Sequence, residues 1–279
     1  MKALLALALV AQVPGGDFRM TGVPTQGGLL TGEAPAGALR VELRAPGVTA
    51  VPVTVEDGRF VVGFDRDAGS SSELVAVMAD GREIRRMLSV VPRAWRIERI
   101  DAPLRAGRTS AEFDAVRPGE LARIAAAREV VTSAVGWRER FRWPATGRLS
   151  GLFGSQRVYR GVPGSFHSGA DVALPTGAPV VAPASGVVVL AADLARPFTL
   201  EGNLLIVDHG GGLSSAFLHL SSIDVREGER VAAGQRVGSV GATGRATGPH
   251  LHWGLRWHGT RLDPLLVAGS MPSEAGRAE

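Results

Sequence analysis

The chain has 279 residues, of which 45% are hydrophobic and 21% charged, so it is long enough for two modest domains and globular in composition. Glycine (37 residues) and proline (17) are frequent, which favours short strands over long helices. Cysteine is absent, which excludes disulfide scaffolds, thiolate zinc sites and cysteine nucleophiles. Aromatic residues make up only 5%, which argues against nucleic acid as a partner.

Basic residues exceed acidic ones by 31 to 27, which gives a formal net charge of +4. Because the two signs interleave along the chain, we interpret most of this charge as a solvated surface. Lys2 is the only lysine, so Schiff-base chemistry and P-loop phosphate binding are excluded from the body of the chain.

Residues 1–16 begin with one cation, Lys2, followed by an apolar run that is too short to cross a bilayer as a helix. Such a run, with small residues behind it, is typical of a signal peptide, and the alternative is a buried N-terminal strand. No other segment is apolar over about 18 residues, so no transmembrane anchor is expected. We therefore predict an exported protein, periplasmic or secreted.

Residues 17–101 predict a small all-β sandwich without a polar cluster that suggests chemistry. At residues 39–43 apolar and charged side chains alternate with a period of two, as in a half-buried strand. Asp57-Gly58 and Asp80-Gly81 separate strand-like runs and predict two hairpins, because both turn residues tolerate positive φ.

Residues 102–143 predict a helical connector. An Ala-rich segment follows Pro118, which favours a helix that begins there and ends near Gly136. Residues 137–143 interleave tryptophan and phenylalanine with arginine, a pattern that nucleic-acid binding or a packed linker could explain. We favour the linker.

Residues 144–268 predict a second β domain with short strands rich in valine and glycine, and residues 269–279 a flexible tail. Four of the six histidines fall in three short phrases of this domain. The phrases are Phe-His-Ser-Gly-Ala-Asp at 166–171, Phe-Leu-His-Leu-Ser at 217–221 and Gly-Pro-His-Leu-His-Trp-Gly at 248–254.

These phrases suggest a metal site. On a strand, His250 and His252 would point to the same face, at a spacing that suits a metal ligand beside a base. His167 and Asp171, with Gly169 between them, could converge across a tight loop. With one histidine of the pair they would supply two imidazoles and a carboxylate, the ligand set of a catalytic zinc site with an open fourth position. Zinc there would polarise a carbonyl and lower the pKa of a bound water towards about 7.

The order of the phrases, H-x-x-x-D, then H-L-S, then G-x-T-G-x-x-T-G-P-H-L-H, resembles the M23 (LytM/lysostaphin-type) zinc metallopeptidases of the bacterial cell wall. Gly-Leu-Phe-Gly at 151–154, Val-Asp-His-Gly at 207–210 and Asp-Pro at 263–264 match as well. The resemblance covers residues 143–266, a little under half of the chain. It implies an antiparallel β core with a groove, here a sandwich or barrel-like domain.

The resemblance also implies the site residues and one Zn²⁺ per chain. The zinc ligands would be His167, Asp171 and His252. The residues that flank the water and the scissile carbonyl, as base and transition-state stabiliser, would be His219 and His250. All of these positions are kept, unlike in degenerate members of the family. Phe217 stands where the family often has tyrosine, so specificity or rate would differ if that hydroxyl contacts substrate.

Other residues of this domain receive structural interpretations. We interpret His209 and His258 as structural or surface residues, and Asp208 as a surface carboxylate or an outer partner of a ligand. The Gly-rich loop at 238–248, which carries Thr243 and Thr247, would shape the groove near the ligands. We favour turns that need positive φ as the reason for its glycines.

The leading hypothesis is an exported zinc metalloendopeptidase that hydrolyses the peptide cross-links of bacterial peptidoglycan, with a D-amino-acid cross-link favoured over a pentaglycine bridge. The alternative is a non-catalytic peptidoglycan-binding or hydrolase-activating module, which a missing ligand would favour. A biotinyl- or lipoyl-type carrier domain is excluded, because it needs a modifiable lysine and none follows Lys2. The N-terminal β domain could position the enzyme on the wall, dock a protein regulator or cover the groove.

Overall fold

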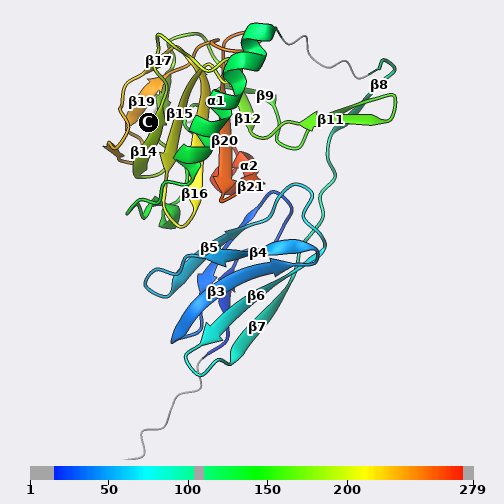
Figure 1. Cartoon of the computed structure of the whole chain (residues 1–279), viewed down its shortest axis with the longest axis vertical. Coiled ribbons are helices and arrows are strands. Elements are labelled where there is room, and N and C mark those ends of the chain that lie inside the picture. Colours follow the sequence, from blue (N-terminus) through cyan, green and yellow to red (C-terminus); the bar gives the residue numbers. More distant parts are fainter. Residues whose placement is uncertain (1–15, 104–109, 273–279) are drawn as a thin grey trace, which may run out of the picture.

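The computed structural model describes residues 16–103 and 110–272 and places them in two β-rich halves (Figure 1). The predicted signal peptide, except for Gly16, and most of the predicted tail lie outside the described residues. Antiparallel sheets dominate both halves, and the helix α1 (Ala111–Arg128) lies between them in sequence. The predicted mainly β fold with a helical connector is therefore confirmed.

The N-terminal half is a sandwich of a three-stranded and a four-stranded sheet. The three-stranded sheet has the order β1 (Arg19–Thr21), β2 (Leu29–Glu33), β5 (Arg59–Gly63). The four-stranded sheet has the order β4 (Val48–Val53), β3 (Ala38–Ala45), β6 (Ser71–Met78), β7 (Glu83–Ser89). In β3, Val41 and Leu43 are buried whereas Arg40 is exposed, and both apolar side chains pack into the same core as Phe60 of the other sheet. Period-two alternation thus places one face of each sheet inside the sandwich.

The two Asp-Gly turns differ in what they connect. Asp80-Gly81 joins β6 to its antiparallel neighbour β7, so this hairpin prediction is confirmed. Asp57-Gly58 also forms a tight turn, with φ of 50° and 75° and a bridge between Glu56 and Arg59. The flanking strands, β4 and β5, belong to different sheets, so the second predicted hairpin is wrong. The turn carries the chain from one sheet of the sandwich to the other.

Helix α1 begins and ends earlier than predicted. Ser110 caps it by accepting a hydrogen bond from the Phe113 N–H at 3.1 Å, and acidic residues occupy the first turn. This cap outweighs the signal of Pro118, which lies inside the helix, where it removes one backbone hydrogen bond. Gly136, expected at the end, lies in a separate 3₁₀ turn. Within residues 16–103 and 110–272, no helix has the length and apolar character needed to cross a membrane.

The C-terminal half is built on an eight-stranded antiparallel sheet, in which seven strands follow one another and the eighth, β21 (Thr260–Leu262), pairs with β20. The order is β18 (Arg230–Val231), β14 (Gly186–Ala191), β15 (Asn203–Asp208), β16 (Leu213–Leu220), β20 (His250–Trp257), β12 (Ala170–Ala173), β9 (Arg148–Gly151). One small sheet beside it has the order β13 (Pro179–Val181), β19 (Arg236–Ser239), β17 (Ser222–Ile223). The other has the order β11 (Val162–Phe166), β10 (Gln156–Tyr159), β8 (Ile97–Ile100). Strand β8 follows the sandwich in sequence but pairs in parallel with β10.

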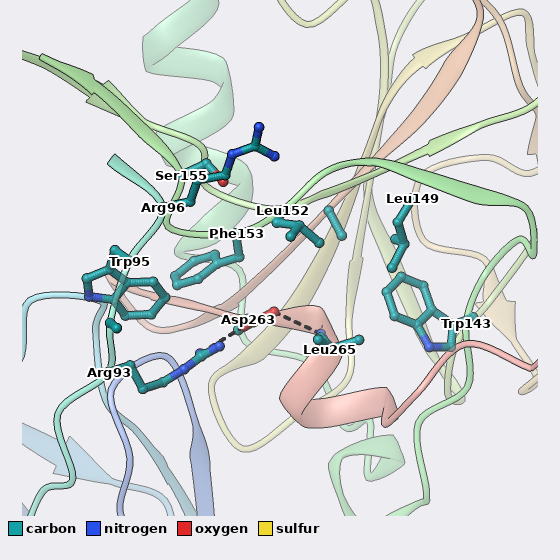
Figure 2. A pocket seen from close by; sticks show the side chains of 12 residues that line it. Arg93, Trp95, Arg96, Trp143, Leu149, Leu152, Phe153, Ser155, Asp263 and Leu265 are labelled. Carbon is teal, nitrogen blue, oxygen red and sulfur yellow. Dashed lines mark hydrogen bonds and ion pairs between the residues drawn. The ribbon is translucent and has the colours of Figure 1, made fainter. Parts of the chain in front are cut away.

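The two halves share one hydrophobic core where β5 meets the β20–β21 hairpin. Gly63 of β5 lies so close to this hairpin that a Cβ would stand 2.9 Å from Leu262 and 3.0 Å from Trp257. An ion pair of 2.8 Å joins Arg93 to Asp263, which also caps α2 (Pro264–Ala268). A pocket of about 160 Å³ lies beside this ion pair (Figure 2). The sandwich therefore docks at the end of β20 opposite its histidines.

Candidate metal centre

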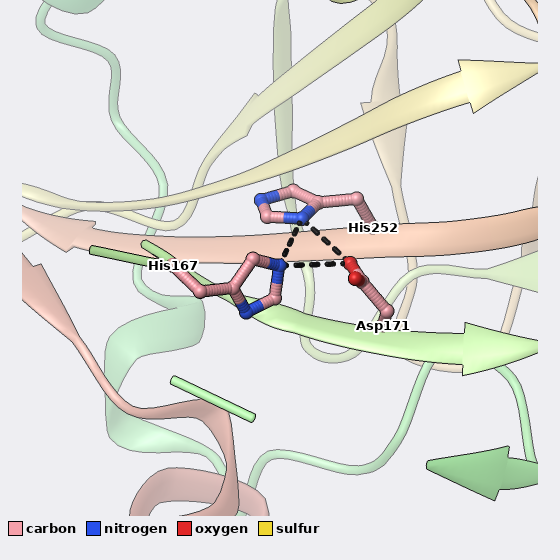
Figure 3. Close-up of side chains that lie close together, drawn as sticks. All are labelled: His167, Asp171 and His252. Carbon is pink, nitrogen blue, oxygen red and sulfur yellow. Dashed lines mark hydrogen bonds and ion pairs between the residues drawn. The ribbon is translucent and has the colours of Figure 1, made fainter. Parts of the chain in front are cut away.

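Three side chains converge where β12 meets β20 (Figure 3). Asp171 on β12 lies directly opposite His252 on β20 in the antiparallel ladder, and His167 precedes β12. Asp171 Oδ1 is 3.0 Å from His167 Nε2 and 2.8 Å from His252 Nδ1, and the two nitrogens are 3.1 Å apart. His250 Nε2 lies farther away, 3.9 Å from Asp171 Oδ1. Of the two histidines on β20, His252 is therefore the one that joins this cluster.

The geometry and chemistry of the cluster fit a zinc ion. Ligand atoms at about 2.0–2.1 Å from a tetrahedral zinc ion stand roughly 3.3 Å apart, close to the separations observed here. Two imidazole nitrogens and a carboxylate oxygen are ligands that zinc accepts. The cluster comprises three residues within the described part of the chain, which leaves a fourth position for water or substrate.

Burial and charge act in opposite directions on these groups. Burial would raise the pKa of Asp171, but the hydrogen bonds from His167 and His252 outweigh it and hold that pKa far below its usual range. At His252 burial prevails over the carboxylate and lowers the pKa, whereas at His167 the carboxylate prevails over burial and raises it. Asp171 is therefore ionised and His252 neutral near pH 7, as metal ligation requires, whereas His167 must give up the proton that Asp171 favours when a metal binds.

Two glycines make room for the cluster. A Cβ at Gly151 on β9 would collide with the carboxylate of Asp171. A Cβ at Gly169, before β12, would stand 2.7 Å from His252 Nε2. Any side chain at either position would displace a residue of the cluster.

His219 and His250 line the same site, with ring centroids 4.9 Å apart. Nδ1 of His219 lies 2.8 Å from the Thr243 carbonyl oxygen, and Nδ1 of His250 lies 2.8 Å from that of Gly248. Because a carbonyl can only accept, we assign a proton to each Nδ1, which leaves each Nε2 free on the other side of its ring. Burial lowers the pKa of His219, and His250 adds to this effect. Sequence reasoning missed that these two carbonyls orient the imidazoles.

His219 reaches the site through a β-bulge. Leu213, Ser215 and Phe217 of β16 point into the core, and strict alternation would turn His219 the same way. Between Phe217 and Leu220 the pairing with β15 shifts by one residue, and His219 adopts φ of +64°. The extra residue turns His219 toward the groove and leaves Leu220 in the core. Left-handed backbone at a non-glycine residue is uncommon and often marks a functional site.

The cluster and both further histidines lie in an open groove of about 350 Å³. The other lining residues are Ser168, Leu200, Glu201, Leu218, Arg245, Ala246 and Thr247. None of the described residues of the N-terminal sandwich lines this groove. Glu201 is held by Arg117 of α1 through two hydrogen bonds of 2.6 and 2.8 Å, so α1 is anchored at the groove edge.

The other histidines and Asp208 lie outside the groove. His209 is fully buried, with its ring nitrogens 2.9 Å from the Ser185 carbonyl and 2.8 Å from Ser215 Oγ, and His258 is exposed in the β20–β21 turn. Both agree with a structural or surface role. Asp208 is neither at the surface nor beside a ligand: it is buried and accepts hydrogen bonds from Thr132 and the Gly210 N–H.

Phe217 and the Gly-rich loop also differ from expectation. Phe217 is fully buried opposite Trp253, so a hydroxyl at this position would lie in the core rather than against substrate.

Among the glycines of 238–248, Gly244 alone has positive φ. A Cβ at Gly238 or at Gly241 would instead strike the neighbouring backbone of residues 219–222. Close approach of two chain segments therefore explains these two glycines better than turn geometry does.

Comparison with known proteins places this architecture in a family. The model of peptidase family M23 matches residues 165–264. A solved structure of a Pseudomonas aeruginosa protein assigned to peptidase M23 is 31% identical, with a TM-score of 0.66, and the match covers 89% of this chain and 96% of that one. The chain therefore belongs to the M23 peptidase family.

Curated relatives match over a shorter region. Peptidoglycan DD-endopeptidase ShyA of Vibrio cholerae is 39% identical over 113 residues, 40% of this chain and 25% of its own length. DD-carboxypeptidase/endopeptidase Mpg of Neisseria meningitidis is 39% identical over 107 residues, 38% of this chain and 24% of its own length. Cell division protein DipM of Caulobacter vibrioides is 33% identical over 174 residues, 60% of this chain and 26% of its own length. The chain spans about a quarter of the length of these relatives.

Proposed function

We propose that this chain is an exported zinc metalloendopeptidase that hydrolyses peptide cross-links of bacterial peptidoglycan. The observation that carries the proposal is the convergence of His167, Asp171 and His252 on one point of an open groove, with His219 and His250 beside it. The relatives that are named peptidoglycan DD-endopeptidases support this substrate and favour a D-amino-acid cross-link. Because this substrate lies outside the cytoplasmic membrane, the proposal includes a periplasmic or secreted location.

His167 Nε2, Asp171 Oδ1 and His252 Nδ1 would hold one zinc ion per chain. When bound, zinc polarises the scissile carbonyl and makes water a stronger nucleophile at neutral pH. The carboxylate of Asp171 would supply negative charge against the cation. The nitrogens of His167 and His252 that contact Asp171 Oδ1 are the same atoms that would bind zinc, so zinc would take the place of the protons in these hydrogen bonds.

His219 and His250 would carry out the proton transfer and the charge stabilisation that the reaction also needs. Burial keeps His219 neutral near pH 7, so its free Nε2 can accept a proton. His250 presents Nε2 on the same side of the groove, because the Gly248 carbonyl holds its Nδ1. The two imidazoles would divide two tasks. One accepts the proton of the attacking water at its free Nε2, and the other stabilises the charge that develops on the carbonyl oxygen, for which it must carry a proton on Nε2 as well as on Nδ1.

A non-catalytic peptidoglycan-binding or hydrolase-activating module is the alternative. Such a module needs neither three convergent ligands nor imidazoles held by backbone carbonyls. Because both features are present, we favour catalysis.

Three variants separate metal binding from catalysis. His252→Ala removes a ligand and is expected to abolish zinc binding in metal analysis. His219→Ala is expected to retain one zinc per chain but to cleave cross-linked muropeptides roughly a hundredfold more slowly, because it loses a proton acceptor or oxyanion donor. His258→Ala, outside the groove, is the control and is expected to keep both properties. A His219→Ala variant with a near-normal rate would refute the role assigned to that residue.

A further inference from the structure

A second cleft, of about 270 Å³, opens from the groove between α1 and the sheet. Ser168, Glu201, Leu218 and His252 line both the cleft and the groove. The cleft therefore continues the groove beyond the metal cluster. Figure 1 shows α1 lying along this face of the sheet, where Ile124 packs against β14 and β15.

The alternation of β20 forms the floor of this cleft. His252, Gly254 and Arg256 share one face of the strand, because the residues between them are buried. Gly254 has no side chain, and its partner on β16 is Ala216, which has only a methyl group. Between His252 and Arg256, therefore, neither residue of this pair places a large side chain on the floor of the cleft. Four residues of strand span about 13 Å, the length of an extended peptide of about four residues.

Two guanidinium groups lie at the far end of the cleft, Arg256 from β20 and Arg128 from the last turn of α1. Within the described part of the chain, neither forms an ion pair with an acidic side chain, and Arg256 donates a long hydrogen bond of 3.5 Å to the Gly259 carbonyl oxygen. Glu201, the acidic residue of the cleft, is already bound by Arg117. Arg128 alone could be explained by the dipole of α1, but that explanation does not extend to Arg256.

Burial disfavours both charges more strongly than the nearby carboxylates of Glu201 and Asp65 favour them. Burial lowers the pKa of Arg256 to about 10, and the charges of Arg128 and Arg261 contribute to the shift. Burial also lowers the pKa of Arg128. Both groups remain charged near pH 7, so the cleft presents two like charges that an anion would stabilise.

We propose that Arg128 and Arg256 form a carboxylate-binding subsite for the stem peptide of the cross-linked substrate. The carboxylate would lie on the second to fourth residue from the scissile bond, as the length of the floor requires. This inference rests on the proposed function, because it takes the groove as the place where substrate binds. Guanidinium groups bind carboxylates through paired hydrogen bonds, whereas a neutral glycine bridge would leave both charges without a partner. The subsite therefore selects acidic stem peptides over glycine bridges.

The test uses the whole zinc-loaded chain and a fluorescein-labelled stem peptide that has neither a cross-link nor a C-terminal D,D-peptide bond, so that neither endopeptidase nor carboxypeptidase activity can cut it. Fluorescence polarisation measures its dissociation constant with the stem carboxylates free and with them amidated. We expect the free form to bind about tenfold more tightly, as for a charge-assisted hydrogen-bonded pair. Arg256→Gln and Arg128→Gln are each expected to remove most of this preference. Arg196→Gln, on an exposed loop outside both cavities, is the matched control and is expected to keep it.

A parallel assay of cross-linked muropeptide cleavage separates this inference from the proposed function. If the wild-type chain cleaves but binds both peptides equally, or if both arginine variants keep the full preference, the subsite is wrong and the peptidase activity stands. If the chain prefers the free peptide through both arginines but cleaves nothing, the subsite stands and the proposed activity fails. Thermal unfolding of each variant identifies loss of fold, and Arg128 at the helix end provides a second variant if Arg256→Gln does not fold.

Discussion

Gly151 has no room for a side chain, because a Cβ there would collide with the carboxylate of Asp171. Gly151→Ala must therefore displace this residue of the metal cluster. We expect its zinc dissociation constant, measured by competition with a chromophoric chelator, to rise at least about tenfold. At Gly259 a Cβ would meet open space, so Gly259→Ala should bind zinc as the wild type does. Equal affinities of the two variants would contradict the close approach of β9 to β12.

His209 predicts a pH dependence of stability. Burial lowers its pKa below the ordinary value of 6.5, so below that pH the unfolded chain binds a proton that the folded chain does not. The free energy of unfolding should therefore fall as the pH drops below about 6.5. His209→Gln should be less stable at pH 8, since a buried side chain is changed, but should lose less stability between about pH 8 and 5. Urea unfolding across this range measures both slopes, and identical slopes would exclude His209 as a source.

Strand periodicity explains which site residues could be predicted from the sequence. It places His250 and His252 on one face without any knowledge of the neighbouring strands. It misplaces His219, because the bulge in β16 depends on the pairing with β15. The hydrogen bonds that His219 and His250 form with the carbonyls of Thr243 and Gly248 were also missed. Every residue has a backbone carbonyl, so the sequence does not show which one a side chain contacts.

The β10–β11 hairpin, which leads into His167, is tied to the N-terminal sandwich by Arg66. This side chain is 5% exposed and donates hydrogen bonds of 3.0 Å to the Gly154 carbonyl and to Gln156 Oε1. The N–H of Gly154 in turn donates to the His167 carbonyl at 2.8 Å. The sandwich thereby contacts the backbone that carries a residue of the metal cluster.

Arg66→Gln would leave the Gly154 carbonyl buried without its donor. We expect it to lower the free energy of unfolding by about 2–4 kcal/mol and to weaken zinc binding severalfold. Arg82→Gln, on an exposed turn of the sandwich, is the matched control and should change neither property. Urea unfolding and chelator competition measure the two effects. Unchanged stability of Arg66→Gln would show that the sandwich does not support this hairpin.

Elements whose boundaries depend on partners were harder to predict than elements with local signals. The Asp80-Gly81 hairpin follows from its own turn residues, and the structure confirms it. The turn at Asp57-Gly58 was equally well predicted, but the sheet that each flanking strand joins depends on distant residues. For α1, the proline rule suggested a start at Pro118, although the cap at Ser110 decides where the helix begins.

At the scale of the whole molecule, the sandwich docks on the β20–β21 end of the C-terminal half and leaves the groove to residues of that half. The predicted domain boundaries and a protein regulator stay predictions. Of the three roles left open for the sandwich, covering the groove finds no support in the described residues, because none of those in the sandwich lines the groove. Instead, α1 borders the cleft, and the Arg117–Glu201 pair anchors it there.

The most direct test of this account is the zinc content of the whole chain, measured together with its release of cross-linked muropeptides with and without a chelator. The account predicts one zinc per chain, cleavage that the chelator abolishes, and recovery when zinc is restored. Zinc without cleavage would favour the non-catalytic module. Absence of zinc, or cleavage that the chelator leaves unchanged, would contradict the assignment of His167, Asp171 and His252 as a catalytic metal centre.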